Sequence, residues 1–215
     1  WLQPLQNFIF LPHQRFYEPH WKAYSYQPAK ARRLLEEAGC RLGADGIYIC
    51  SGERLSLRLV TTPGLAVRTR TTELVQAQLR LAGVEVKPSF VSRGALFGQV
   101  LPNGDFDLAL FQWTTNPDPS ASADIWRCKG PVNFTGYCDR LVTQEFVQSQ
   151  LIVDAEQRAR SLNRADRQMA KHVPALPLFQ VPATTAFKGI QLRGLVPNAT
   201  FEGILWNSED WWLER

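Results

Sequence analysis

The chain has 215 residues, 45% of them apolar and 20% charged, which is the composition of an ordinary folded protein with one large domain or two small ones. Its 24 Lys and Arg and 20 Asp and Glu give a net charge of +4. Nucleic-acid binding needs cations clustered on one face, so these scattered charges predict no nucleic-acid partner. No apolar run approaches the roughly 20 residues that cross a bilayer, and no signal peptide is present. The chain begins at Trp1 without Met, in mid-pattern, so we expect it to be part of a longer protein.

The first half of the chain alternates between helix and strand patterns. In order, these predict an irregular segment (1–27), a helix (27–39), a strand (54–62), a helix (66–83) and a strand (84–91). Pro28 suits the first turn of the first helix, and Gly39 suits its end. Leucines alternate with polar residues in RLSLRLVTT, as in a half-buried strand, and Pro88 weakens the second strand.

The second half adds two strands, two longer helices and a mixed tail. The patterns predict a short helix and turn (92–104), the most buried strand (105–113), helices at about 139–151 and 154–172, a strand (174–181), and short strands in a tail from about residue 183. The centre of the chain therefore has the order strand–helix–strand–helix–strand. This alternation predicts an α/β fold with a mainly parallel or mixed central sheet flanked by helices.

The four cysteines fall into two pairs, each ten positions apart. Structural zinc ligands are usually separated by two to four residues, so this spacing predicts no metal site. Proximity favours the disulfides Cys40–Cys50 and Cys128–Cys138 among the three pairings that four cysteines allow, and each would contribute roughly 2.5–3 kcal/mol. Disulfides imply an oxidising, extracytoplasmic setting. The alternative is four buried thiols that act as small apolar side chains.

Signs of catalysis are few. The sequence has no Gly-x-Ser-x-Gly, His-Glu-x-x-His or phosphate-loop motif. Its three histidines, His13, His20 and His172, lie far apart, and His172 at a predicted helix end can simply interact with the helix dipole. Asp105 and Asp107 share one face of a predicted strand and could act as acid and base, although such a Gly-Asp start is more typical of a turn. We therefore expect no catalytic residues and no cofactor.

The stretch FQWTTNPDPSASADIWRC (111–128) begins at the end of a predicted strand. In parallel sheets, ligands bind outside the carboxyl ends of the strands. Those ends are predicted at Thr61–Gly64, Ser92–Gly94 and Trp113–Asp118. Closely spaced prolines stiffen the last of these segments, so its polar groups need little ordering when a ligand binds.

The candidate ligand-binding residues are Trp113, Thr114, Thr115, Asn116 and Asp118. The indole offers a large apolar plate with one N–H donor, and the hydroxyls and the amide both donate and accept hydrogen bonds. Asp118 can accept from a ligand amine or cap a local turn. This mixture suits a small polar ligand such as a peptide. A Trp that fills the core at a strand end, followed by a stiff turn, fits the pattern equally well.

Six motifs in chain order resemble one known family. They are YQPAKARRLLEEAG, RLSLRLVTT, ELVQAQLRLAGVEVKPSFV, GDFDLALFQWTTNPDPS, NFTGY and PALPLFQV. Their succession, over about residues 24–206, resembles the C-terminal half of the family 5 extracellular solute-binding proteins, the peptide- and nickel-type receptors of bacterial ABC importers. The resemblance implies a periplasmic-binding-protein-like lobe. Its implied parts are an irregular hinge segment (1–23), the second lobe of the receptor (24–182), and a tail (183–215) that returns toward a first lobe outside this chain.

The resemblance implies a non-enzymatic function, the binding of peptides or similar small polar solutes by hinge closure between two lobes. In peptide-binding members, the Trp, the next residue and an acidic residue three positions after the Trp contact the ligand. The matching positions here are Trp113, Thr114 and Asn116. Asn116 departs from the pattern, because a neutral amide cannot form the charge-assisted bond of a carboxylate. Either Asp118 replaces it, or the ligand is not a free-amine peptide.

The implied partners are the ligand and, through the full-length receptor, the ABC permease subunits. The implied location is extracytoplasmic, at the cell surface or in the periplasm, with membrane contact only through an N-terminal lipoprotein-type anchor outside this chain. Two alternatives stay open at this point. One is an α/β enzyme such as a hydrolase or transferase, and the other is a sensor or interaction module that no longer serves transport.

Overall fold

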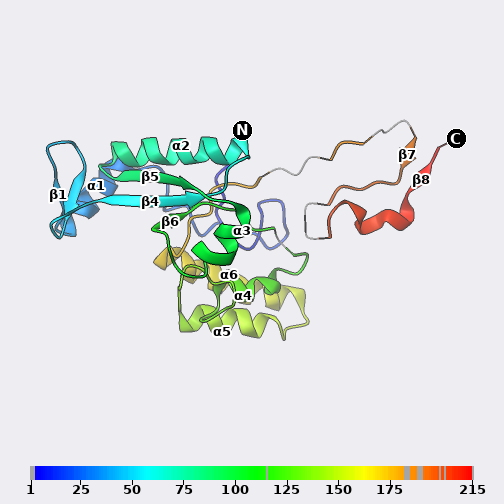
Figure 1. The fold of residues 1–215 in the computed structure, drawn as a ribbon. Coiled ribbons are helices and arrows are strands. Elements are labelled where there is room, and N and C mark those ends of the chain that lie inside the picture. Colours follow the sequence, from blue (N-terminus) through cyan, green and yellow to red (C-terminus); the bar gives the residue numbers. More distant parts are fainter. Residues whose placement is uncertain are drawn as a thin grey trace. The chain divides into compact units, whose positions relative to one another are not determined.

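The computed structural model describes residues 3–114, 116–181, 185–187, 191–198, 200 and 202–214 (Figure 1). The chain divides into two compact units, which are described separately. Unit 1 combines Trp1–Ala23 with Trp113–Arg215, and unit 2 is Tyr24–Gln112. The three-part organisation expected from the sequence, with a hinge segment, a second lobe and a tail, concerns the whole receptor and stays a prediction.

Unit 2 is an α/β unit built around a parallel sheet. Its elements are α1 (Pro28–Glu37), β1 (Arg41–Leu42), β2 (Tyr48–Cys50), β3 (Glu53–Arg54), β4 (Ser56–Thr61), α2 (Ala66–Leu81), β5 (Glu85–Phe90), α3 (Arg93–Ala95), the π-helix η1 (Leu96–Val100) and β6 (Leu108–Ala109). The sheet has the strand order β5-β4-β6, and β4 is parallel to both neighbours. Helix α2 connects β4 to β5 and lies alongside them (Figure 1). The predicted helices and the predicted parallel pair are therefore confirmed.

Strand β4 is the most buried strand of this sheet. Its last three residues, Leu59, Val60 and Thr61, are all buried, because a central strand is covered on both edges as well as on its faces. The prediction that 105–113 is the most buried strand was wrong. Only Leu108–Ala109 forms β6, and no residue of 105–113 is buried, because β6 is an edge strand.

A small antiparallel sheet, β1-β2-β3, precedes β4 and was missed by the sequence patterns. Its strands are only two or three residues long, which is too short for a periodic signal. The disulfide Cys40–Cys50, with a Cα–Cα distance of 4.3 Å, ties the start of β1 to the end of β2. Tyr48 joins this sheet to its surroundings, because its N–H donates to the carbonyl of Gly83 at 2.8 Å.

Unit 1 is mainly helical and irregular. Its elements are the 3₁₀ helix η2 (Pro119–Ser122), α4 (Ala123–Trp126), α5 (Arg140–Ser149), α6 (Ala155–His172), β7 (Leu192–Arg193), the 3₁₀ helix η3 (Ile204–Asp210) and β8 (Trp212–Leu213). Asp139 and Asp154 accept the Val142 and Gln157 N–H groups and so cap α5 and α6. Both long predicted helices are confirmed.

The core of unit 1 brings its two chain segments together. Its buried members are Ile9, Phe10, Trp21, Ala123, Trp126, Val142, Phe146, Ala159, Leu162, Ala165, Met169 and Ala170. The N-terminal segment is irregular, as predicted, yet it supplies three of these side chains. Segments without periodic secondary structure thus contribute to a close-packed interior.

Buried polar groups attach the N-terminal segment to α6. Asp166 is 0% exposed and accepts hydrogen bonds from the Phe8 N–H at 2.9 Å, from His20 Nδ1 at 2.7 Å and from the Trp21 indole at 3.2 Å. The Asn7 amide donates to Asn163 Oδ1 at 3.1 Å. These bonds satisfy groups that would otherwise be costly to bury.

The predicted strand 174–181 was wrong. Only Phe179 forms a bridge there, antiparallel to Pro4. Pro174 and Pro177 lack the N–H groups that a ladder requires, so an extended apolar segment does not become a full strand. The predicted short strands of the tail include β7 and β8, which pair with each other.

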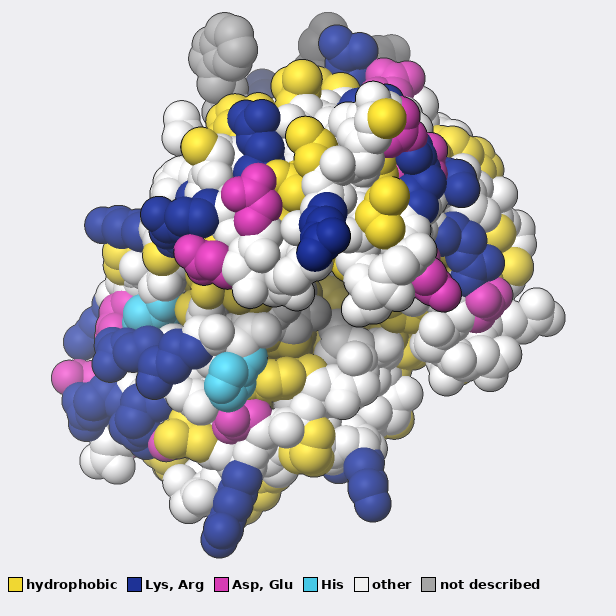
Figure 2. Space-filling model, turned by 90° about the vertical axis from the view of Figure 1, so that its left-hand side faces the viewer, with side chains coloured by type: hydrophobic (Ala, Val, Ile, Leu, Met, Phe, Trp, Pro, Cys, Tyr) yellow, Lys and Arg dark blue, Asp and Glu magenta, His cyan; other side chains and the backbone are white. Residues whose placement is uncertain are grey.

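Charged side chains on the surface are mixed in sign. On the face drawn in Figure 2, Asp and Glu side chains lie beside many of the Lys and Arg side chains, with apolar side chains between them. On α6, for example, Arg164 pairs with Glu145 and Arg167 pairs with Glu18. In the described part of the chain, none of the helices combines the length and apolar character required to cross a membrane.

Candidate functional site

An aromatic pair, an exposed Trp113 and a half-buried Phe134, lies at the predicted ligand stretch. Trp113 and Phe134 stack with their rings nearly parallel, at an interplanar angle of 10° and a centroid distance of 6.0 Å. Trp113 is 38% exposed. The indole therefore does not fill a hydrophobic core, and strand β6 has already ended at Ala109.

The other predicted site residues differ in their surroundings. Thr114 and Asn116 are exposed, and Thr115 lies outside the described residues. Asp118 caps the N-terminus of η2, where its carboxylate accepts the Ser120 N–H at 2.9 Å, and it also pairs with Arg158 at 3.3 Å. Of the two roles considered for Asp118, the structure shows the capping of a local turn.

Phe134 was missed by the sequence analysis. It lies in the loop between Cys128 and Cys138, which the second predicted disulfide closes with a Cα–Cα distance of 4.5 Å. Both predicted disulfides are thus present. The signal that could have indicated Phe134 is an aromatic residue in the middle of a short loop between paired cysteines. Nothing local in the sequence indicates its partner, Trp113.

The three loops expected at one sheet edge divide between the units. Thr61–Gly64 and Ser92–Gly94 follow β4 and β5 of unit 2, whereas 113–118 belong to unit 1. Within unit 2, Thr61 Oγ1 donates to the Leu110 carbonyl at 2.7 Å. The structure brings Trp113 together with Phe134, inside unit 1.

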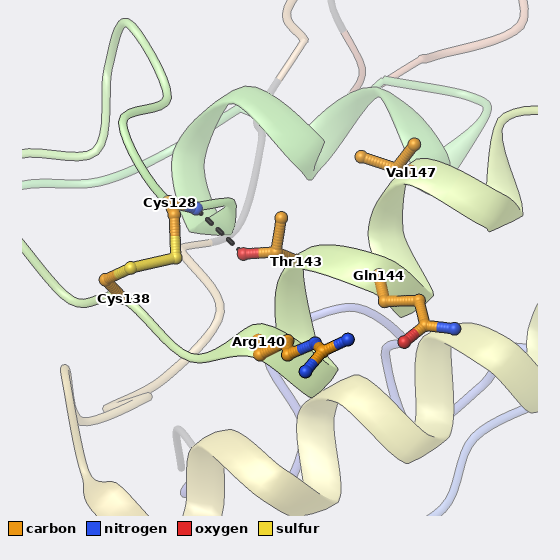
Figure 3. Close-up of a pocket in the computed structure, with 6 residues that line it drawn as sticks. All are labelled: Cys128, Cys138, Arg140, Thr143, Gln144 and Val147. Carbon is orange, nitrogen blue, oxygen red and sulfur yellow. Dashed lines mark hydrogen bonds between the residues drawn. A yellow bond between two sulfur atoms is a disulfide. The ribbon is translucent and has the colours of Figure 1, made fainter.

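A surface pocket of about 550 Å³ lies beside the second disulfide (Figure 3). Its lining residues are Cys128, Cys138, Arg140, Thr143, Gln144 and Val147. Four of them come from α5, and the Thr143 hydroxyl is turned toward the Cys128 N–H, from which it accepts a hydrogen bond at 2.9 Å. Among the residues that the structure describes, none of the predicted ligand-binding residues lines the pocket, and Arg140 is the charged residue of its lining.

The end of the disulfide loop carries titratable groups in fixed positions. Burial, followed by the negative charge of Asp139, raises the pKa of Tyr137 to about 12. The Tyr137 hydroxyl lies 2.8 Å from His172 Nδ1. Burial acts to raise the pKa of Asp139, but the hydrogen bonds from the Val142 N–H and the Gln168 amide outweigh it, so this pKa is lowered. Tyr137 therefore stays protonated and Asp139 stays charged at neutral pH.

Asp105 and Asp107, the candidate acid–base pair of the sequence analysis, both contact Arg58. The Asp107 carboxylate accepts the Arg58 N–H at 2.7 Å, and Asp105 forms an ion pair with the Arg58 side chain. Both carboxylates therefore hold the start of β6 against β4. His13 is exposed and His20 belongs to the Asp166 cluster. Among the described residues, no three His, Cys, Asp or Glu side chains are grouped to hold a metal ion.

Sequence comparison connects this arrangement with a family. The model of the bacterial extracellular solute-binding proteins, family 5 (middle region), matches residues 3–134. The oligopeptide-binding protein AppA of Bacillus subtilis is 29% identical over 196 residues, which are 89% of this chain and 36% of AppA. The oligopeptide-binding protein OppA of Mycobacterium tuberculosis is 24% identical over 86% of this chain and 31% of OppA. The chain thus spans about a third of the length of these curated relatives.

Solved structures agree on the fold. AppA of Bacillus subtilis in complex with a nonapeptide matches with a TM-score of 0.79 at 25% identity, covering 100% of this chain and 43% of that one. The periplasmic EDTA-binding protein EppA matches with a TM-score of 0.89 at 23% identity, covering 100% of this chain and 40% of EppA. At this identity, the match supports the fold alone. The predicted periplasmic-binding-protein-like α/β class is confirmed.

Family members bind substrates and are not enzymes. The family model covers more than half of this chain, and both relatives named above are oligopeptide-binding proteins. The chain belongs to the bacterial extracellular solute-binding proteins of family 5.

Proposed function

We propose that the chain supplies one wall of the ligand site in the extracytoplasmic receptor of an ABC importer, and that the ligand is a peptide or a similar small polar solute. The observation that carries this proposal is the exposed Trp113 stacked flat on Phe134. A fixed indole presents a large apolar contact with little loss of side-chain entropy on binding.

The charges around Trp113 restrict the kinds of ligand that the site can bind. Asn116 is exposed and neutral, while Asp118 shares its carboxylate between the Ser120 N–H and Arg158. A ligand amine would therefore meet an amide oxygen rather than an unpaired carboxylate, and a neutral hydrogen bond is weaker than a charge-assisted one. We infer that the site tolerates ligands without a free amino terminus and holds them mainly by apolar contact and backbone hydrogen bonds.

Binding would proceed by hinge closure in the full-length receptor. A ligand shifts an open–closed equilibrium only through the extra contacts that it makes in the closed state. Trp113 supplies such contacts from this chain, and the rest of the receptor supplies the opposite wall. The closed receptor would then deliver its ligand to the permease subunits. The two disulfides support the extracytoplasmic location, because such bonds persist in oxidising compartments.

The test is peptide binding by the full-length protein. A synthetic nonapeptide, selected from a random library by its binding to the wild type, is titrated by calorimetry into the wild type and into Trp113→Ala. We expect the substitution to weaken binding at least about tenfold, equivalent to about 1.4 kcal/mol.

The matched control is Trp212→Ala, because Trp212 is 53% exposed and lies on β8. Its affinity should equal that of the wild type. An unchanged affinity in Trp113→Ala would remove Trp113 from the site. If the wild type selects no nonapeptide at all, the ligand is not a peptide of this size.

A further inference from the structure

We propose that the disulfide loop Cys128–Cys138 is a positioning element of the ligand site, which holds the Phe134 ring flat against Trp113 and so sets the plane of the indole. This inference rests on the proposed function, because it assumes that Trp113 contacts the ligand. It assigns a role in binding to a disulfide and to a phenylalanine that lie 15 to 25 positions after the tryptophan.

The loop is closed by covalent and polar bonds within itself. The disulfide joins its two ends. Between them, the Asn133 side-chain amide donates to the carbonyl of Arg127, the residue before the loop, at 2.9 Å and to the Tyr137 carbonyl at 2.7 Å, so one side chain connects the start of the loop with its end. Phe134 comes directly after Asn133, so these hydrogen bonds also restrain the backbone position of Phe134.

The loop is also anchored to the helices on either side. The Cys128 N–H donates to Thr143 on α5 at 2.9 Å, and Tyr137 Oη lies 2.8 Å from His172 on α6. At Gly130 a Cβ would overlap the Asp124 carbonyl of α4, so the backbone packs tightly there. The ends of the loop therefore form a rigid frame for the residues between them.

Stacking on Phe134 restricts the orientation of the Trp113 ring. The two rings are nearly parallel, with an angle of 10° and centroids 6.0 Å apart. Trp113 itself lies in no helix or strand, so its backbone alone does not fix the ring. A phenyl plate against one face restricts the tilt of the indole. Preorganisation of this kind reduces the entropy that a side chain loses on binding.

The two disulfides provide an unusually matched pair for a test. Both have a sequence separation of 10, but only Cys128–Cys138 encloses Phe134. In the full-length protein, binding of the same selected nonapeptide is measured for Phe134→Leu, Phe134→Tyr, the double variant Cys128→Ser/Cys138→Ser and the control Cys40→Ser/Cys50→Ser. Thermal unfolding of each variant shows whether it is folded at the temperature of the titration.

We expect Phe134→Leu and Cys128→Ser/Cys138→Ser to weaken binding about fivefold, and Phe134→Tyr and Cys40→Ser/Cys50→Ser to stay within about twofold of the wild type. The long-wavelength tryptophan bands of the near-ultraviolet circular dichroism, where tyrosine does not absorb, should change in Phe134→Leu and be retained in Phe134→Tyr, because they depend on the ring stacked against the indole. A purely structural loop would lower the unfolding temperature without this pattern.

Wild-type affinity in Phe134→Leu, together with weakened binding in Trp113→Ala, would overturn the inference and leave the proposed function intact. Wild-type affinity in Trp113→Ala would overturn the proposed function and, with it, the role of the loop in binding. If Cys128→Ser/Cys138→Ser does not fold, the two Phe134 variants decide the matter.

Discussion

Unit 2 and unit 1 are stabilised by different kinds of contact. In unit 2, strand β4 lies between two parallel neighbours, and its buried end is apolar apart from Thr61. In unit 1, buried polar side chains, above all Asp166, join the N-terminal segment to α6 in addition to their shared apolar core. Unit 2 depends mainly on the burial of apolar surface, whereas unit 1 depends also on hydrogen bonds between buried polar groups.

This difference shows how an irregular segment can be part of a core. The N-terminal segment has no helix and only one isolated bridge among its described residues. Instead, its backbone and side-chain groups form hydrogen bonds with the side chains of Asn7, Asn163 and Asp166. Buried groups need partners, and side chains can provide them where a regular ladder does not.

The largest effect that would sharpen the comparison is expected for Asp166→Ala. The substitution leaves the Phe8 N–H, His20 and the Trp21 indole without their shared acceptor. Removing one member of such a buried charged cluster should lower the free energy of unfolding by about 4 kcal/mol. Urea unfolding, followed by tryptophan fluorescence, measures the change.

The control for this variant is Asp124→Ala, because the Asp124 side chain is 54% exposed and pairs with Arg127. It should change the free energy of unfolding by less than about 1 kcal/mol. If Asp166→Ala costs no more than Asp124→Ala, the buried polar cluster does not stabilise unit 1.

The next effect concerns the apolar side of the comparison. Leu59 is 3% exposed in the middle of β4, so Leu59→Ala leaves a cavity and should lower the free energy of unfolding by about 3 kcal/mol. Leu74→Ala on α2 is the control, because Leu74 is 48% exposed. Equal unfolding midpoints for the two variants in urea would show that β4 is not the packed centre of unit 2.

The smallest effect is a dependence of stability on pH that belongs to unit 1. Burial and the positive charge of Arg167 act to lower the pKa of His20. The hydrogen bonds to Asp166 and Glu18 outweigh both effects, so this pKa is raised above 6.5. A raised histidine pKa means that its stabilisation is fully present below about pH 6.5 and is lost as the pH rises through the folded-state value.

The corresponding experiment compares unfolding midpoints across this pH range. The wild type should lose stability as the pH rises, and His20→Gln should show a flatter profile. His13→Gln, at an exposed position, should follow the wild type. A wild-type slope in His20→Gln would assign the pH dependence to another group.

Much of unit 2 could be predicted because its signals are local. The alternating leucines of RLSLRLVTT predicted β4, and the segments on either side of Gly83 predicted α2 and β5. The central position of β4 was not predictable in this way, because the apolar run of DFDLALFQW looks more buried than it is. Strand order depends on pairing between segments, which a local pattern does not contain.

The candidate site was predicted in part. The sequence singled out Trp113 from its place after an apolar run, and the structure shows it exposed. The sequence did not indicate Phe134, nor that Asp118 would be occupied by Ser120 and Arg158. These partners are separated from the predicted residues by loops whose course the sequence alone does not specify.

By itself, the sequence determined the longer helices α1, α2, α5 and α6, the parallel strand pair, both disulfides and the family of this protein. The periods of 3.6 and 2 residues and the proximity of the cysteines are properties of short segments. Tertiary structure decided which strand became central, how the N-terminal segment joined α6, and which ring stacked on Trp113. Contacts such as that between Trp21 and Asp166 join residues 145 positions apart. They form only when the whole chain has packed, because burial makes unpaired polar groups costly and so selects their partners.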